Sequence, residues 1–137
     1  MSLPIDAFTG ILHPEVKAYL EALPEKPDAL LQALSDYAAE RGFPLVGRSS
    51  GRTMALLLQL IGGERVYECG SGFGYSAYFF ARAVGANGEV HGAEKDAWEL
   101  EAHARLYAGS PLIQRIHLHE GEAFAVLEGL EGDFDAF

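Results

Sequence analysis

Three glycines alternate with other residues directly after a short run of β-forming residues. The segment consists of Glu68, Cys69, Gly70, Ser71, Gly72, Phe73 and Gly74. Glycine permits a tight turn and lets a ligand approach the backbone closely. Where such a loop opens a helix, the free N–H groups of the first turn can also bind a ligand. A plain turn does not require three alternating glycines, so the segment predicts a loop that binds a small molecule.

Two classes of ligand use a loop of this kind. Dinucleotide-binding enzymes use G-x-G-x-x-G, but here Tyr75 holds the third glycine position and Gly74 comes one place early. The carboxylate of Glu68, at the tip of the strand, would repel a pyrophosphate. It suits a ligand with a sulfonium and an ammonium group, which indicates S-adenosylmethionine. A NAD-type oxidoreductase domain and a non-catalytic module that keeps the fold are the alternatives.

The same segment resembles the first motif of the class I S-adenosylmethionine-dependent methyltransferases, an acidic residue followed by x-G-x-G-x-G. Its continuation, Tyr75–Ala77, is similar to the small-molecule O-methyltransferases related to catechol and caffeoyl-CoA O-methyltransferases. The resemblance runs from about Phe43 to the end of the chain, and more loosely through the N-terminal helices. It implies methyl transfer to an oxygen of a small hydroxylated acceptor, with this chain holding mainly the cofactor-binding half of the enzyme.

Two later motifs extend the resemblance. Glu94 lies twenty residues past Gly74, where a carboxylate can accept both hydroxyls of a ribose. The run 121–123 resembles the family's Gly-Asp-Ala motif, whose acidic side chain faces the adenine; a first-turn glutamate that complements a helix dipole is the alternative. The cofactor-binding residues that the resemblance implies are Glu68, Gly70, Ser71, Gly72, Phe73, Gly74, Ser76, Glu94, Lys95, Gly121, Glu122 and Ala123.

Other reactive residues are given smaller roles. Cys69 is expected to pack in the core rather than act as a nucleophile. His117 and His119 share one face of a strand, but no third ligand is near in sequence, so we expect no metal site in this stretch. In the resembling family, metal-dependent members place their ligands later, so a divalent metal belongs to a longer parent. The catalytic residues are unknown and expected beyond Phe137.

The elements that must position this loop fall into two parts. Residues 1–63 are predicted to form a helical cap that packs on the core. Its first helix begins at Pro14 and is broken by Pro24, its second is capped by Asp28 and ended by Gly42, and its third spans 51–61. Ser49 or Ser50 is the expected cap of the third helix, which is apolar on most sides and therefore expected to be buried.

Residues 64–137 are predicted to form the cofactor-binding half of one α/β domain. Strands are expected at 65–69, 89–93, 115–119 and 133–137, with helices between them, the second opened by a capping box of Asp96 and Glu99. This order implies right-handed crossovers and a Rossmann-like parallel sheet with flanking helices. Such sheets bind ligands at the carboxyl ends of their strands, where the glycine loop lies. The fold looks truncated after the fourth strand, whose edge we expect another copy to cover, giving a homo-oligomer.

Composition excludes several partners. Ten Lys and Arg against twenty Asp and Glu give a net charge of −10, which argues against nucleic acid and anionic membranes. The longest apolar run, 54–61, is far shorter than the roughly 20 residues of a membrane-spanning helix. A single cysteine excludes an internal disulfide framework, and residues 1–4 lack a basic leader. These features predict a cytoplasmic protein with a small-molecule partner.

Overall fold

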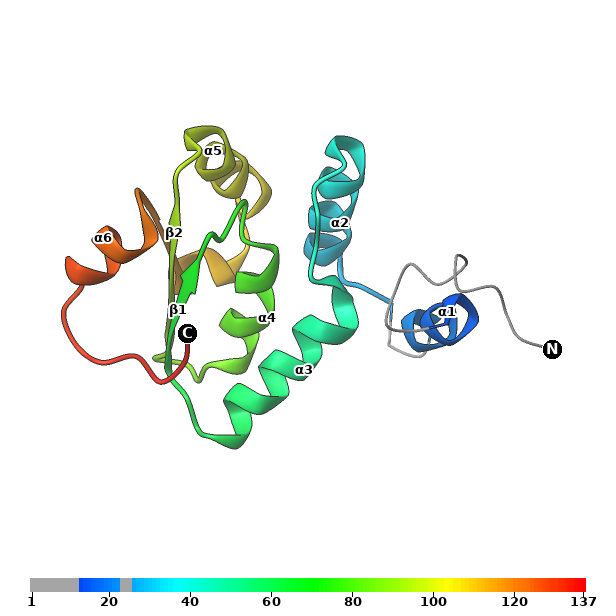
Figure 1. Ribbon diagram of the computed structural model, residues 1–137, viewed down its shortest axis with the longest axis horizontal. Helices are drawn as coiled ribbons and strands as arrows, with labels where there is room; N and C mark the ends of the chain where they lie inside the picture. The colour runs from blue at the N-terminus through cyan, green and yellow to red at the C-terminus, as the bar shows by residue number, and fades with distance from the viewer. Residues whose placement is uncertain (1–12, 23–25) are drawn as a thin grey trace.

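The computed structural model describes residues 13–22 and 26–137 (Figure 1). Three strands, β1 (Arg65–Cys69), β2 (Glu89–Glu94) and β3 (Ile116–Glu120), pair in parallel in the order β1-β2-β3. In register, Val66 pairs with Val90, and Val90 with Ile116. The connections are α4 (Tyr75–Ala83), α5 (Ala97–Leu106) with the 3₁₀ helix η2 (Pro111–Arg115), and α6 (Ala123–Glu128) after β3. The predicted parallel α/β fold is confirmed.

Helices cover both faces of the sheet. Figure 1 shows α6 on one face and α4 on the other, with α3 (Gly47–Leu60) and α2 (Ala29–Arg41) outside α4. Apolar side chains from the strands, α2 and α4 form one core. Its members include Leu34, Val66, Phe73, Ala77, Phe79, Val90 and Tyr107. None of the helices in the described ranges is long and apolar enough to cross a membrane.

The first two helices follow their local signals. Helix α1 (Pro14–Ala22) begins at the predicted proline, although Pro24 lies outside the described residues. The side chain of Asp28 accepts a hydrogen bond from the N–H of Leu31 at 2.9 Å, which confirms the predicted cap of α2. Gly42 ends α2 in the left-handed conformation, with φ of 61°. These two caps fix the ends of α2, whose apolar residues pack in the core against α4.

Helix α3 differs from its prediction. It begins at Gly47, four residues early, and Val46 is its N-cap, so the predicted serine caps are wrong. The predicted burial is also wrong, because only Gly51 and Leu58 are buried. A Cβ at position 51 would lie 2.5 Å from the ring of Phe79, so this glycine lets α3 pack closely on α4. The large apolar side chains that remain exposed near the end of α3 are Leu56, Leu57, Leu60 and Ile61.

The predicted capping box of α5 does not form. Asp96 is the N-cap, but its side chain makes no capping hydrogen bond. Oε1 of Glu94 instead accepts hydrogen bonds from the N–H groups of Lys95 and Asp96, just before the helix, at 2.7 and 3.1 Å. The carboxyl of Glu99 is instead buried in the protein.

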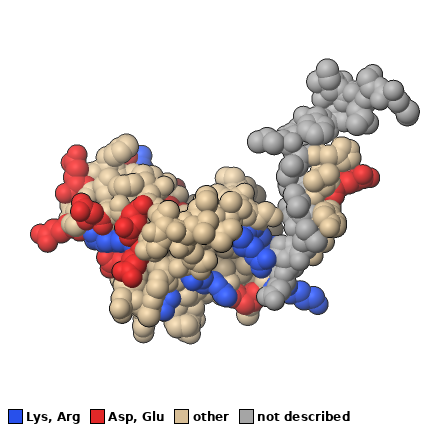
Figure 2. All heavy atoms as spheres, turned by 90° about the horizontal axis from the view of Figure 1, so that it is seen from below, with Lys and Arg blue, Asp and Glu red and all other residues tan. Residues whose placement is uncertain are grey.

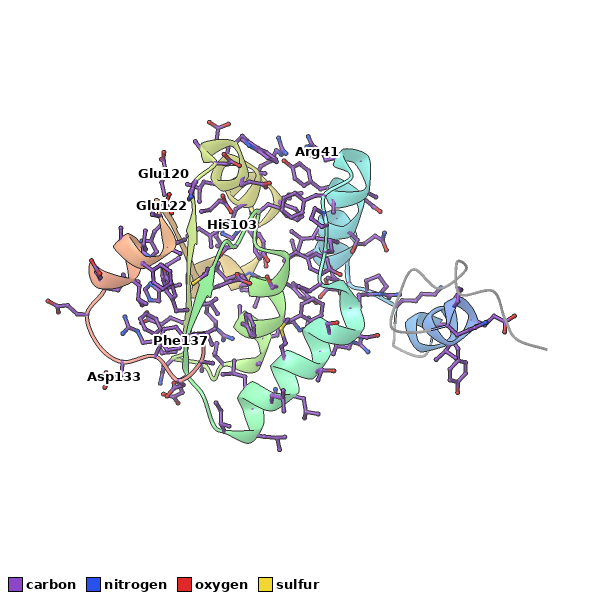
Figure 3. The ribbon with its side chains drawn as sticks, viewed as in Figure 1. Arg41, His103, Glu120, Glu122, Asp133 and Phe137 are labelled. Carbon is purple, nitrogen blue, oxygen red and sulfur yellow. The ribbon has the colours of Figure 1, made fainter. Side chains whose placement is uncertain are left out.

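The predicted fourth strand is reduced to a single bridge. Residue Ala136 pairs with Val66 in parallel, on the side of β1 opposite to β2. One carboxylate oxygen of Asp135 accepts hydrogen bonds from the N–H groups of Glu64 and Arg65, both at 2.8 Å. The guanidinium of Arg65 lies 4.3 Å from the ring centroid of Phe134. The last residues thus lie along β1, and Phe137 is exposed there (Figure 3).

Candidate functional site

The glycine loop folds back over the end of the neighbouring strand. Gly70, Gly72 and Gly74 have φ values of 76°, 53° and 90°, a region that residues with a side chain rarely adopt. The N–H groups of Gly70 and Ser71 both donate to the carbonyl of Ala93, at 3.0 and 3.1 Å. The predicted glycine positions are therefore required by the turn itself, and the loop is held against the carboxyl end of β2.

A further glycine, which the sequence showed only as a weak point of a strand, makes this turn possible. Gly92 lies in β2 opposite Glu68. A Cβ at this position would lie 1.8 Å from Oγ of Ser71 and 2.8 Å from a methyl carbon of Leu118. No side chain can occupy that space while the loop keeps its position, since atoms that are not bonded to each other do not approach so closely. The signal was visible as a glycine in the middle of a predicted central strand.

Glu94 joins the three loops at the carboxyl end of the sheet. Its Oε2 accepts a hydrogen bond from the N–H of Gly72 at 2.9 Å, while Oε1 takes those of the two residues after it. Its carbonyl accepts from the N–H of Gly121 at 2.8 Å. The structure thereby brings together the glycine loop, the end of β2 and the turn after β3, as the parallel sheet predicts. A carboxylate fixed at this point can accept hydrogen bonds from hydroxyl groups of a ligand.

The turn after β3 contributes an ion pair. Nζ of Lys95 lies 2.6 Å from Oε1 of Glu122, and both side chains are more than half exposed. Glu120 and Glu122 lie at the end of β3 and the start of α6 in Figure 3. Ala123 opens α6, and its carbonyl accepts a hydrogen bond from the hydroxyl of Tyr67. Lys95 and Glu122 are therefore adjacent, and an adenine contact by Glu122 stays a prediction.

Glu68 is the least satisfied group of the loop. Its Oε2 and Oγ of Ser71 are buried, and neither has a hydrogen-bond partner among the described residues. Burial raises the pKa of the Glu68 carboxyl from 4.5 to about 7, and the facing hydroxyls of Ser76 and Ser71 offset only part of this rise. The carboxyl is therefore held near its titration point, which is a feature typical of functional sites.

Phe73 anchors the loop to the core instead of facing a ligand. Its ring is 1% exposed and packs edge-on against Tyr37 and Phe43, with centroids 4.8 and 5.1 Å away. Beneath the loop, Tyr107 donates its hydroxyl proton to the carbonyl of Gly74 at 2.6 Å, and Nδ1 of His103 lies 3.3 Å from the carbonyl of Phe73. The sequence predicts no functional role for His103 in α5 or for Tyr107 at its end, because nothing local links them to the loop.

A second buried carboxyl lies beside Glu94. Glu99 is 2% exposed, and neither of its carboxylate oxygens has a hydrogen-bond partner within the described part of the chain. Burial and, to a smaller extent, the negative charges of Glu94 and Asp96 together raise its pKa from 4.5 to about 7, against the opposing effect of Arg41. The carboxyl end of the sheet therefore combines a hydrogen-bonded carboxylate with two carboxyls that titrate near neutrality.

The other reactive residues differ in part from expectation. Cys69 is exposed, so its predicted place in the core is wrong; it is the last residue of β1 and points away from the core. His119 stacks on His91 with Nε2 3.0 Å from Nδ1 of His91, an arrangement that the strand register creates. Across residues 13–22 and 26–137, no group of three or more His, Cys, Asp or Glu side chains could hold a metal ion.

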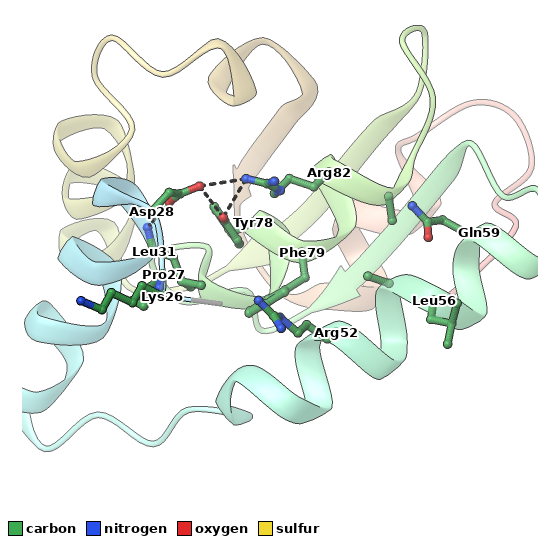
Figure 4. Close-up of a pocket in the computed structure, with 12 residues that line it drawn as sticks. Lys26, Pro27, Asp28, Leu31, Arg52, Leu56, Gln59, Tyr78, Phe79 and Arg82 are labelled. Carbon is green, nitrogen blue, oxygen red and sulfur yellow. Dashed lines mark hydrogen bonds and ion pairs between the residues drawn. The ribbon is translucent and has the colours of Figure 1, made fainter. Parts of the chain in front are cut away.

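A separate hollow of about 410 Å³ lies between α2, α3 and the later turns of α4 (Figure 4). Asp28 there accepts hydrogen bonds from the hydroxyl of Tyr78 and from Arg82, at 2.6 and 2.8 Å. Lys26 and Arg52 also line this hollow. It involves none of the glycine-loop residues, and its polar network ties the start of α2 to α4.

Comparisons with known proteins agree with this geometry. A family model described as O-methyltransferase matches residues 26–136. Catechol O-methyltransferase of Niastella koreensis is 29% identical over 126 residues, which are 88% of this chain and 57% of that protein. The crystal structure of a methyltransferase from Geobacter sulfurreducens superposes with a TM-score of 0.80 at 28% identity, covering 90% of this chain and 62% of that one.

A third relative was solved with its cofactor. The O-methyltransferase TomG from Streptomyces achromogenes, involved in tomaymycin synthesis, is a complex with S-adenosylmethionine. It superposes with a TM-score of 0.80 at 27% identity, covering 90% of this chain and 58% of that one. The chain belongs to the O-methyltransferase family. It spans about 60% of the length of the relatives that it matches.

Proposed function

We propose that the carboxyl end of the sheet binds S-adenosylmethionine and that the protein transfers its methyl group to an oxygen of a small hydroxylated acceptor. Membership of the O-methyltransferase family and the cofactor-bound relative support the activity. The main observation in support of this site is that the Glu94 carboxylate accepts hydrogen bonds from three backbone N–H groups. The donors are Gly72, Lys95 and Asp96. These bonds hold the carboxylate in place before any ligand arrives.

The described residues fit such a cofactor in several ways. A Cβ at Gly70 would meet no atom within 4 Å, so a ligand can approach the backbone of the turn at this residue. Glu94 would accept the ribose hydroxyls, and the turn at residues 121–123 would border the adenine. Glu68, with its unpartnered oxygen, would face the positively charged end, near Ser71 and Ser76. Phe73 would act through packing, by fixing the loop.

The reaction needs little covalent chemistry from the protein. The sulfonium group of the cofactor supplies an electrophilic methyl group. The protein binds both reactants and orients them for an in-line displacement, which is an entropic contribution to the rate. No residue of this chain is assigned as the general base or as a ligand of a divalent metal. No observation favours the oxidoreductase alternative.

Titration calorimetry on the purified chain tests this function. We expect S-adenosylmethionine to bind and NAD not to bind. Replacing Glu94 with Ala removes the ribose acceptor and should weaken cofactor binding by about 2 kcal/mol, since a hydrogen bond to a charged group is lost. Glu128→Ala, an exposed carboxylate on α6, is the matched control and should bind as the unchanged protein does. Binding of NAD alone by a folded chain contradicts the proposal.

The remaining features of the proposal concern partners and location. We infer a small-molecule acceptor, because the net charge of −10 disfavours nucleic acid. On the face shown in Figure 2, acidic side chains gather at the end of the molecule that holds α6. A cytoplasmic location fits the single, exposed Cys69. Assembly as a homo-oligomer and a helical cap formed by residues 1–63 also remain proposals.

A further inference from the structure

We propose that the Glu68 carboxyl gives up a proton when a cationic cofactor binds, so that cofactor affinity depends on pH through this one group. The inference rests on the proposed function, because it assigns the cationic ligand to the glycine loop. It concerns the acid–base state of the site, which family membership does not fix. The expected consequence is a site that discriminates between charged and uncharged ligands more strongly at high pH.

The geometry gives this carboxyl hydroxyl neighbours and no charged partner among the described residues. Glu68 is the second-last residue of β1 and pairs with Gly92, whose missing side chain leaves room for Ser71 of the loop. Oε2 of Glu68 is buried without a hydrogen-bond partner among the described residues, and the same holds for Oγ of Ser71. Two polar atoms at the base of one turn therefore have unused capacity to bind. An orphaned buried oxygen is costly unless a ligand or water satisfies it.

The groups that face Glu68 are neutral. From the loop and the first turn of α4 they are the hydroxyls of Ser71 and Ser76. At the end of α5, the hydroxyl of Tyr107 donates a hydrogen bond to the carbonyl of Gly74. Burial raises the pKa of Tyr107, and the negative charge of Glu68 adds to this rise. Within the described part of the chain, no cation contributes to the pKa of Glu68, which burial raises to about 7.

A cationic ligand reverses this balance. An opposite charge within a few ångströms favours the ionised carboxylate and lowers its pKa, so binding releases a proton near neutral pH. The pKa of Glu68 is higher in the free protein than in the complex. The affinity for the cofactor is therefore greatest at pH values above the pKa of the free protein and falls as the pH drops below that pKa. With a pKa of about 7, the ionised fraction predicts affinity about tenfold weaker at pH 6 than at pH 8.

Calorimetry in two buffers with different enthalpies of ionisation measures the proton release directly. We would titrate S-adenosylmethionine at pH 6, 7 and 8 into the unchanged protein and into Glu68→Gln, which mimics the protonated carboxyl. The unchanged protein should release about half a proton more than the variant at pH 7, because roughly half of the carboxyls are still protonated there before the cofactor binds. Taking the difference cancels the titration of the cofactor's own amino group.

Two further arms sharpen the experiment. Glu99→Gln removes a buried carboxyl with a similar pKa that lies by Glu94, and it should keep the proton release. S-adenosylhomocysteine retains the ammonium but lacks the sulfonium. Proton release with both ligands assigns the ammonium as the partner of Glu68, and release with S-adenosylmethionine alone assigns the sulfonium; either supports the proposal.

Equal proton release by the unchanged protein and by Glu68→Gln overturns the inference while leaving cofactor binding intact. A folded chain that binds neither ligand overturns the proposed function, and this inference with it. If Glu68→Gln does not fold, Ser76→Ala takes its place. Loss of that hydroxyl should raise the pKa of Glu68 and move the maximum of proton release to higher pH, and an unmoved maximum refutes the proposal.

Discussion

The glycine loop and helix α3 adjoin the two ends of the same strand, β1, yet their side chains meet opposite environments. The loop at residues 70–74 is almost wholly buried, and its backbone is fixed by bonds to Ala93, Glu94 and Tyr107. Helix α3 packs on α4 with only Gly51 and Leu58 buried, while four large apolar side chains near its end are exposed. Hydrogen bonds therefore hold the glycine loop in place, whereas a few apolar contacts hold α3.

This contrast teaches that apolar residues in sequence do not by themselves mark the buried face. In α3, adjacent leucines differ completely: Leu58 is 3% exposed and Leu57 is 58% exposed. In the loop, by contrast, Gly72 and Gly74 are buried although they have little apolar surface. The difference arises because backbone conformation determines the path of the loop. The buried side of α3 is determined by its contact with α4, where Gly51 packs against Phe79.

The largest expected effect tests α3. Leu58→Ala should lower the free energy of unfolding by about 4 kcal/mol, since it leaves a cavity beside α4. Leu57→Gln, one residue away, should change it by less than about 0.5 kcal/mol, because that side chain is already in water. Urea unfolding of the two variants measures both values. Similar losses in the two variants would mean that the exposed face is covered in solution.

The next effect comes from Glu99. Its pKa is raised from 4.5 to about 7, so the folded state holds its proton more tightly and loses stability as the pH rises through this interval. Relative to Glu99→Gln, the unchanged protein should lose about 3 kcal/mol between pH 4 and pH 8, at 1.36 kcal/mol per unit. Urea unfolding at both pH values gives the difference. A parallel pH dependence in the two proteins would show that Glu99 ionises freely in the fold.

The smallest of the three effects concerns Gly92. Gly92→Ala places a methyl group against Ser71 and should cost about 2 kcal/mol of unfolding free energy by overpacking. Gly85→Ala is the matched control, because a Cβ there meets only one atom, at 3.9 Å, and the variant should be nearly neutral. Thermal unfolding of both is sufficient. A neutral Gly92→Ala would show that the loop can shift away from β2 without loss.

Local signals explain what the sequence predicts well. The cap at Asp28, the glycine turn and the alternation of strands and helices each depend on residues within a few positions, and the structure confirms all three. The approach of Glu94 to Gly72 also follows from the sheet, because parallel strands end at one edge.

Tertiary contacts explain what the sequence predicts poorly. The spacing of Asp96 and Glu99 fits a capping box, but Glu94 takes the N–H of Asp96 that the side chain of Glu99 would bond. The fourth strand pairs at only one bridge, and the face that α3 buries depends on its glycine contact with Phe79. The roles of His103 and Tyr107 beneath the loop have no local signature at all.

The contacts of Asp135 have a consequence for cleavage of the chain. This carboxylate holds the backbone at Glu64 and Arg65, about seventy positions earlier in the chain, while Arg65 lies over the ring of Phe134. After a cut in the exposed turn at residues 128–133, only these non-covalent contacts would hold residues 134–137 against β1. A few exposed hydrogen bonds do not offset the entropy of holding a separate segment, so such a cut should free this edge of β1.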